Sequence, residues 1–299
     1  MKIVVAGGSG FLGEPLVRRL VARGDDVAVL TRNPSRVRAG RALQWDGRTQ
    51  GAWSEQAAAA DAVVNLAGEN VGEGRWTDAR KRQLLDSRLH ATHAIVEALR
   101  RDPSRRRTLV NASATGFYGD RGDETLDESG SRGGGFLAAV VDRWEAAARE
   151  AEPLARLVIL RFGVVLAEEG GALAKMLLPF KLGAGGPIGS GEQWMSWIGR
   201  DDAIRMVEWA VDHGTVRGVY NATAPEPVRN RDFTKALGRA LHRPAFLPVP
   251  AFALRLAFGQ MADEALLGSQ KVLPRRAEAE GFTFEAREIA SGLAKALGR

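Results

Sequence analysis

The feature that most constrains the fold is a glycine-rich segment near the amino terminus, GGSGFLG over residues 7–13. It follows an apolar run, KIVVAG (2–7), and precedes a helical pattern in which Leu12, Leu16 and Leu20 recur every four residues. A glycine turn between a buried strand and a helix leaves free N–H groups at the helix start, where a phosphate group is favoured. The segment therefore predicts a strand–turn–helix unit that binds the pyrophosphate of a dinucleotide.

Short apolar runs alternate with helical patterns through the first two-thirds of the chain. Further strands are predicted at 27–32, 43–46, 62–68, 108–114 and 155–166, with a long amphipathic helix at 77–101. This alternation predicts an α/β fold, a Rossmann-type doubly wound parallel sheet with helices on both faces. We expect a nucleotide-binding domain at 1–165, to which 198–224 return, and a smaller, mainly helical substrate or cap region at 166–197 and 225–299.

Composition excludes several other classes of protein. The chain has 299 residues, of which 45% are hydrophobic and 26% charged, and it has no cysteine. No apolar run approaches the ~20 residues of a membrane span, and MKIVVAGG enters a strand pattern without a signal peptide, so we expect a cytoplasmic protein with no membrane partner. The net charge of +6 is scattered, which argues against nucleic acid. His90 and His93 have no third ligand, so no metal site is predicted.

The second strand indicates which dinucleotide is bound. An NAD site usually places an acidic residue near this strand's end, where it holds the ribose 2′-OH. Here the strand ends in Leu30, Thr31 and Arg32, whereas the acidic residues Asp25 and Asp26 precede it. A guanidinium at Arg32 can pair with a 2′-phosphate, which favours NADP(H). The alternative is that Arg32 is a solvated loop cation.

At NLAG (65–68) and NASATGFYG (111–119), two later strand ends, the chain resembles the extended short-chain dehydrogenase/reductase superfamily. More narrowly it is similar to an atypical epimerase-family branch, the SDR39U1 type. The motifs behind this narrower match are SRLHAT (87–92), WEAAAR (144–149), RFGVVL (161–166), LLPFKLGAGGPIGSGEQWMSWI (177–198) and GSQKVLPRRA (268–277). The resemblance implies NADP(H) in a Rossmann domain and a characteristic carboxyl-terminal module from about Pro248.

The resemblance also implies the residues that contact the cofactor. At the glycine loop and the second strand these are Gly7, Ser9, Gly10, Phe11, Leu12, Gly13, Thr31 and Arg32. Elsewhere they are Leu66, Ala67, Gly68, Glu69, Arg88 and Val164. Two of these assignments have alternatives, because Glu69 could be a loop hydrogen-bonding group and Arg88 an ordinary surface arginine.

The proton relay of this superfamily is missing. Its tyrosine and lysine, four residues apart, would fall in FLAAVVDRW, where Phe136 and Val140 stand instead. Ser113 fills the place of the serine that polarises the substrate carbonyl. Of the two tyrosines, Tyr220 lies in a strand pattern, whereas Tyr118 follows the strand of Ser113 and is a candidate proton donor or a structural residue.

Two functions are therefore compatible with the sequence. The first is an NADP(H)-dependent oxidoreductase or epimerase-like enzyme, with Ser113 and Tyr118 at the reacting centre and a small-molecule substrate. The second is a non-catalytic NADP(H) sensor that acts through a partner. Either could be a monomer or a homodimer.

Overall fold

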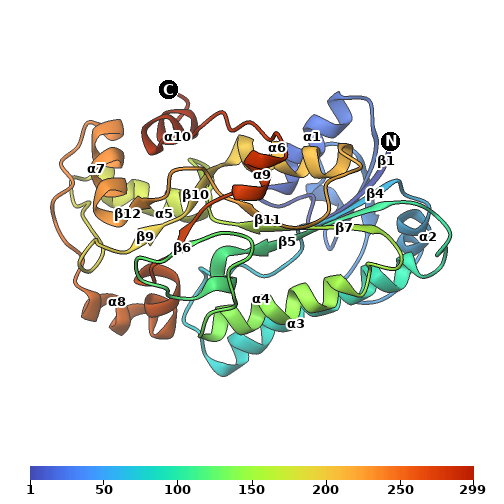
Figure 1. Cartoon of the computed structure of the whole chain (residues 1–299), viewed down its shortest axis with the longest axis horizontal. Helices are drawn as coiled ribbons and strands as arrows, with labels where there is room; N and C mark the ends of the chain where they lie inside the picture. Colours follow the sequence, from blue (N-terminus) through green and yellow to red (C-terminus); the bar gives the residue numbers. More distant parts are fainter.

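The computed structural model describes residues 1–299, and its centre is a parallel sheet of seven strands (Figure 1). The strands stand in the order β11-β7-β5-β4-β1-β2-β3, and every neighbouring pair is parallel. Their bounds are β1 (Lys2–Ala6), β2 (Asp26–Thr31), β3 (Arg41–Gln44), β4 (Ala62–Asn65), β5 (Thr108–Ala114), β7 (Arg156–Phe162) and β11 (Gly218–Ala222). Strand order reverses between β1 and β4, which is the point where such sheets bind their ligands. The predicted doubly wound parallel sheet is confirmed.

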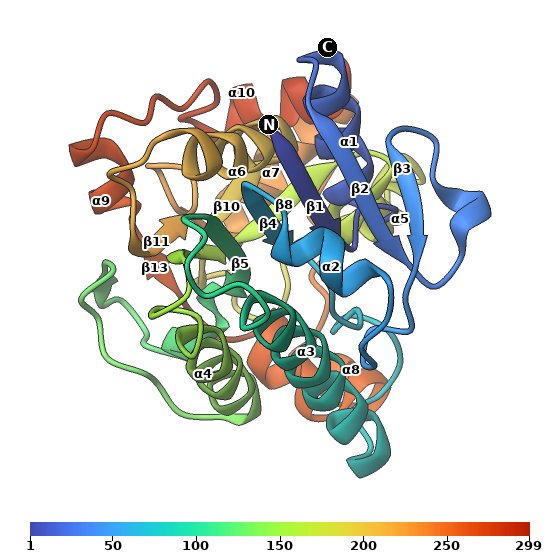
Figure 2. The same cartoon turned by 90° about the vertical axis from the view of Figure 1, so that its right-hand side faces the viewer.

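Helices cover both faces of this sheet, as Figure 2 shows. The helices of one face are α1 (Gly13–Ala22) and α6 (Arg200–Asp212), and those of the other are α2 (Trp53–Ala58), α3 (Asp78–Leu99) and α4 (Phe136–Arg149). Because both faces are buried, strands such as β1 and β4 are continuous runs of β-branched and small residues rather than alternating patterns.

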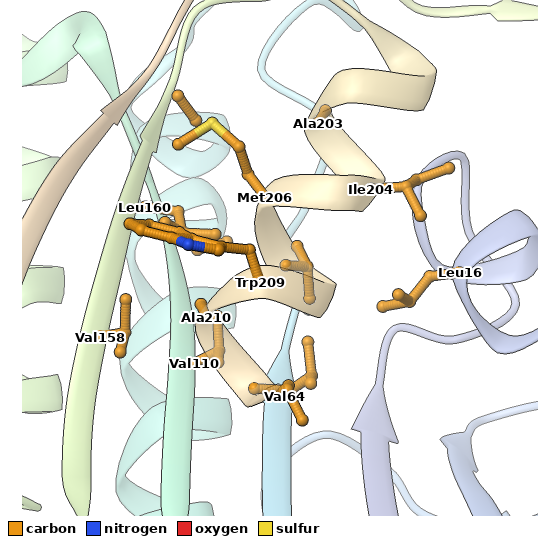
Figure 3. Close-up of a cluster of buried hydrophobic side chains, with 14 of the residues drawn as sticks. Leu16, Val64, Val110, Val158, Leu160, Ala203, Ile204, Met206, Trp209 and Ala210 are labelled. Atoms are coloured by element: carbon orange, nitrogen blue, oxygen red, sulfur yellow. The ribbon is translucent and has the colours of Figure 1, made fainter. Parts of the chain in front are cut away.

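The segment 198–224 packs on and within the large sheet. In Figure 3, Met206 and Trp209 of α6 lie on the side of the sheet residues Leu160 and Val158, and Ile204 points toward Leu16 of α1; all of them belong to one buried cluster. β11 then adds the last strand beside β7. The division of the chain into domains remains a prediction, but these contacts tie 198–224 to the nucleotide-binding sheet.

One predicted strand is wrong in its extent. The apolar run 155–166 forms two strands, β7 and β8 (Val164–Ala167), which are separated at Gly163. A Cβ at Gly163 would lie 2.6 Å from the carbonyl oxygen of Ser196, so the chain can turn away only at a glycine. β8 leaves the large sheet and pairs with β10 (Trp197–Gly199). Hydrophobicity alone does not reveal this turn, because both strands are apolar.

A smaller region covers the carboxyl ends of the strands, at the left of Figure 1. Its helices are α5 (Gly171–Lys181), α7 (Asn230–Leu241), α8 (Ala251–Phe258) and α10 (Ile289–Ala296), whereas α9 (Arg275–Ala279) packs on β11 of the large sheet. Its short strands are β9 (Trp194–Met195), which pairs with β12 (Val228–Arg229), and β13 (Lys271–Val272), which pairs with β6 (Thr125–Leu126). A π-helical turn, η3 (Ala262–Leu266), follows α8, and two 3₁₀ turns, η1 (Pro34–Arg36) and η2 (Thr115–Tyr118), follow β2 and β5.

None of the helices combines the length and the apolar character that crossing a lipid bilayer requires.

Candidate functional site

The glycine loop between β1 and α1 presents unpaired backbone N–H groups. Gly7 has a φ of +77°, and a Cβ there would lie 2.9 Å from the carbonyl carbon of Leu66. A Cβ at Gly13 would lie 2.1 Å from the carbonyl oxygen of Gly7, so glycine is required at both positions. The N–H of Gly10 donates to Gly7 at 3.0 Å, but those of the next two residues make no hydrogen bond within the chain. The start of α1 therefore has free donors for an anion.

The end of β2 lies beside this loop. The Ser9 and Thr31 hydroxyl oxygens are 3.4 Å apart, which joins the loop to the strand end. The next side chain, Arg32, is 77% exposed and lies 3.5 Å from the carboxylate of Glu69. Glu69 belongs to the β4–α3 loop and also lies 3.3 Å from Arg80. Four of the predicted cofactor contacts, on three segments, are thus brought together at one edge of the sheet.

Arg88 of α3 is a half-buried cation that forms no ion pair with a carboxylate. Its guanidinium donates to the carbonyl oxygens of Leu84 at 2.8 Å and Glu69 at 3.0 Å. It lies 5.1 Å from the centre of the Trp144 ring and directly against Gly68, whose added Cβ would stand 3.3 Å from the guanidinium carbon. Burial lowers the pKa of Arg88 to about 10. A partly desolvated charge without an ion-pair partner is a candidate binding group for an anionic ligand.

The smaller region also reaches this edge of the sheet. The loop between β8 and α5 packs on the ring of Phe11, where a Cβ at Gly170 would come within 2.5 Å of the ring. Lys175 of α5 donates to the carbonyl oxygen of Gly72 at 2.5 Å, in the β4–α3 loop. Val164 begins β8, and its N–H donates to Ser196 at 2.8 Å. The carboxyl-terminal side of the chain thus encloses the glycine loop.

Ser113 belongs to a buried polar network. Its hydroxyl donates to Glu145 of α4 at 2.6 Å. Arg161 of β7 donates to both oxygens of the same carboxylate, at 2.7 and 2.8 Å. The side chains of Glu145 and Arg161 are only 3% and 4% exposed, so this is a buried, bidentate ion pair.

Tyr118 completes this network. Arg161 donates to the Tyr118 hydroxyl at 3.0 Å, and that hydroxyl lies 2.8 Å from the side-chain oxygen of Asn221. Tyr118 is fully buried, and its burial raises the pKa of the phenol above its ordinary value. The structure therefore places both catalytic candidates, Ser113 and Tyr118, inside the protein with their hydroxyls engaged. In this arrangement neither hydroxyl is free, which agrees with the structural alternative given for Tyr118, and the catalytic roles of both residues stay a prediction.

The first turn of α4, where the missing tyrosine would stand, is capped by the carboxyl-terminal region. The Phe136 ring packs against Trp76, with centroids 5.3 Å apart, and Val140 is buried. The backbone N–H groups of Phe136 and Leu137 donate to the Glu264 carboxylate at 3.0 and 2.8 Å. Glu264 thus satisfies donors that a helix start leaves free.

Sequence reasoning missed the roles of Glu145, Arg161 and Glu264. A signal for the first two was present: Glu145 continues the apolar stripe of Ala138 and Val141 on α4. Arg161 likewise lies within the continuous buried run of β7. Two opposite charges at buried positions of neighbouring elements predict an ion pair. Glu264 carries no such signal, because its partner lies more than 120 residues away.

No group of three or more histidine, aspartate or glutamate side chains could hold a metal ion. His93 lies 3.4 Å from Glu150 at the surface.

This arrangement has known counterparts. The model of the NAD dependent epimerase/dehydratase family matches residues 3–223. The chain belongs to that family. A second model, a domain of unknown function designated DUF1731, matches residues 249–296. Together they confirm the predicted epimerase-family resemblance and its carboxyl-terminal module.

Several individual proteins are similar over the whole chain. The epimerase family protein Mb2239 of Mycobacterium bovis is 39% identical, covering 99% of this chain and 98% of that protein. The crystal structure of human epimerase family protein SDR39U1 (isoform 2) with NADPH has a TM-score of 0.90 and 36% identity, covering 100% of both chains. A nucleoside-diphosphate sugar epimerase from Corynebacterium glutamicum has a TM-score of 0.80 and 32% identity, covering 99% of this chain and 58% of that one. This family member is thus an atypical short-chain dehydrogenase/reductase with the SDR39U1 architecture.

Proposed function

We propose that this chain binds NADP(H) and uses it to reduce a small carbonyl or enone compound. The observation that carries the proposal is the pair of cations at the edge of the sheet. Arg32 stands at the end of β2, where an NAD-binding protein usually has an acid, and Arg88 is a half-buried charge without an ion-pair partner.

The residues present fit the cofactor. The free N–H groups at the start of α1 would accept the pyrophosphate, and Gly7 and Gly10 let the backbone approach it. Arg32 would exchange its weak, exposed pairing with Glu69 for the 2′-phosphate, and Arg88 would supply a further positive charge. Support also comes from the human relative, whose crystal structure contains NADPH.

The chain's own residues limit the chemistry. NADPH, when bound, supplies a hydride. Phenylalanine and valine occupy the positions of the proton-supplying tyrosine and its lysine. The hydroxyls of Ser113 and Tyr118 already form hydrogen bonds within the protein. We therefore propose that the proton comes from water. This favours reduction over epimerisation, because epimerisation needs a reversible acid–base group. A cytoplasmic monomer or homodimer remains the expected form.

The cofactor part is tested by titrating the purified chain with NADPH and NADH. We expect NADPH to bind more tightly, and Arg32→Ala to weaken NADPH by about tenfold to a hundredfold, since a charge-assisted pair with phosphate is lost. NADH should change by less than about twofold, because it has no 2′-phosphate. Equal losses for both cofactors would contradict the assigned position of Arg32. Arg36→Ala, an exposed arginine four residues further on, is the matched control.

A second function, NADP(H) sensing without catalysis, is favoured by the engaged hydroxyls of Ser113 and Tyr118. The two functions separate when the chain is incubated with NADPH and a broad panel of aldehydes, ketones and enones. Oxidation of NADPH that depends on one of these compounds supports the reductase. Tight NADPH binding without turnover of any of them supports the sensor.

A further inference from the structure

The large apolar side chains exposed to solvent are concentrated in one part of the molecule. Seven of the nine lie between residues 178 and 258, and the other two are Met1 and Val21. Six of the seven form what we call the α5–α8 surface, which consists of Leu178, Leu182, Phe246, Leu247, Phe252 and Leu256. The three on the helices, and Leu182 directly after α5, are between 68% and 76% exposed. A monomer in water seldom exposes so many large apolar side chains in neighbouring segments.

The segments of this surface are adjacent. At the end of α5, Lys181 accepts a hydrogen bond from Arg243 through its carbonyl oxygen, at 3.0 Å. The N–H of Leu247 donates to Gly185 at 3.2 Å, so the segment that enters α8 follows the end of α5. Figure 1 shows α5 and α8 on the side of the molecule away from β1.

The apolar faces of α5 and α8 both lie next to the β4–α3 loop. On α5, Lys175, Leu178 and Leu182 share one face, and Lys175 donates to Gly72 of this loop. On α8, Phe252 and Leu256 continue to Gly259, where an added Cβ would lie 3.4 Å from Arg75 of the same loop. The α5–α8 surface therefore borders the loop that carries Glu69 and lies beside Arg88.

The charges around this surface are mainly positive. Arg75, Lys175 and Arg243 are exposed and form no ion pair with any carboxylate. Lys181 and Arg255 do have partners, but both members of each pair are largely exposed, so these pairs hold little charge in place. The whole chain carries a net charge of +6. The complementary partner is therefore anionic and apolar.

A second copy of this chain does not fit that description. A second copy carries the same net charge of +6, so it does not supply the negative charge that these cations lack. The surface also has no tyrosine or tryptophan, which are enriched among the side chains that dominate binding at protein interfaces. Phenylalanine and leucine flanked by arginine and lysine are typical of helices that lie in the interface of a membrane.

We propose that the α5–α8 surface attaches the protein to an anionic lipid surface. Phe252 and Leu256 enter the boundary between headgroups and acyl chains, while Arg75, Lys175 and Arg243 contact the headgroup phosphates. The sequence predicts no membrane partner because it has no spanning segment, but interfacial attachment requires none. The attachment turns the β4–α3 loop, and with it the rim of the candidate site, toward the lipid.

Vesicle co-sedimentation of the full chain tests this attachment. We expect binding to vesicles of phosphatidylcholine with phosphatidylglycerol, and binding at least about tenfold weaker to phosphatidylcholine alone, since the attraction to headgroups is then lost. The double variant Phe252→Ser, Leu256→Ser should bind the anionic vesicles at least about tenfold more weakly than the wild type. Both side chains are largely exposed, so the variant should keep its melting temperature.

Val21→Ser is the matched control, because Val21 is an exposed apolar residue on α1 outside the surface. It should bind vesicles as the wild type does. The proposal is overturned if the wild type does not sediment with anionic vesicles, or if the double variant still binds them equally. It is likewise overturned if sedimentation velocity shows a micromolar dimer that the double variant abolishes, because a second copy then covers the surface. None of these outcomes depends on whether the chain binds NADPH.

Discussion

The glycine loop follows β1, and the network around Glu145 lies on β5 and β7 of the same sheet, with β4 between them. The polar groups of these two regions differ in how far they are satisfied by hydrogen bonds. At the glycine loop, two backbone N–H groups have no partner and Arg88 has no counter-ion. In the network, no buried side-chain nitrogen or oxygen of Ser113, Glu145, Arg161, Tyr118 or Asn221 lacks a hydrogen bond.

This difference separates a binding site from a structural element. Buried or aligned polar groups without partners cost free energy, and a ligand that supplies the partners recovers it. A network that is already complete gains nothing from a ligand and instead fixes the elements it joins, here β5, β7, β11 and α4. The starts of two helices differ in the same way. Backbone N–H groups at the start of α1 have no partner, which we call an open helix start, whereas those of α4 donate to Glu264, which we call a closed one.

Breaking the network should have the largest effect. In Glu145→Ala, Arg161 would remain buried without its counter-ion, so we expect the free energy of unfolding to fall by about 3–5 kcal/mol. Urea unfolding measures this loss, and NADPH titration below the transition should give an affinity within about twofold of the wild type. The double variant Glu145→Ala, Arg161→Met should recover part of the loss, because it removes the unpaired charge. A variant that keeps its stability but loses turnover would instead make Glu145 a catalytic group.

Removing Arg88 should lower the affinity for NADPH and leave the stability unchanged or higher, which is the opposite of the effect expected for Glu145→Ala. We expect Arg88→Met to weaken NADPH binding by about tenfold. Its free energy of unfolding should be equal to that of the wild type or higher by up to about 2 kcal/mol, since a desolvated charge is lost. Lower stability together with unchanged NADPH affinity would assign Arg88 a structural role.

The pH dependence of this stability difference follows from the pKa of Arg88. Its folded-state pKa is lowered to about 10, below the ordinary value for arginine. Below about pH 10 both folded and unfolded chains hold the proton, so the wild type carries the full penalty. Above that pH the unfolded chain binds more protons than the folded one, and the wild type gains stability relative to Arg88→Met. Melting curves at several pH values between about 6 and 9 should therefore show a constant difference.

The sequence predicts the glycine loop better than it predicts the network around Glu145. GGSGFLG identifies the anion site because a local motif fixes both the turn and the start of the helix. The missing tyrosine and lysine are equally visible at Phe136 and Val140. What the sequence does not reveal is where the remaining hydroxyls point. Ser113 faces Glu145 because of the register of β5 against β7 and the packing of α4, which are long-range properties.

The same reason applies to the side chain of Tyr118. Its place after a strand end predicts a position at the ligand-binding rim, but the side chain turns inward to Arg161 and to Asn221, which is 103 residues away. The single strand predicted over 155–166 is divided into β7 and β8 for a related reason. The turn at Gly163 depends on the backbone of Ser196, which no local pattern reports.

The smallest effect is expected at the helix start that Glu264 closes. Glu264→Gln removes the negative charge that faces the first turn of α4 but keeps an oxygen that can accept a hydrogen bond, so the loss should be about 0.5–1 kcal/mol. Urea unfolding measures it, with Glu278→Gln as the control, because Glu278 pairs with Arg287 at the surface and should change stability by less than about 0.5 kcal/mol. NADPH affinity should be unchanged, because the cofactor uses the start of α1. A loss of NADPH affinity in Glu264→Gln would mean that α4 and the glycine loop are coupled, and the contrast between the closed and open helix starts would then describe one site rather than two.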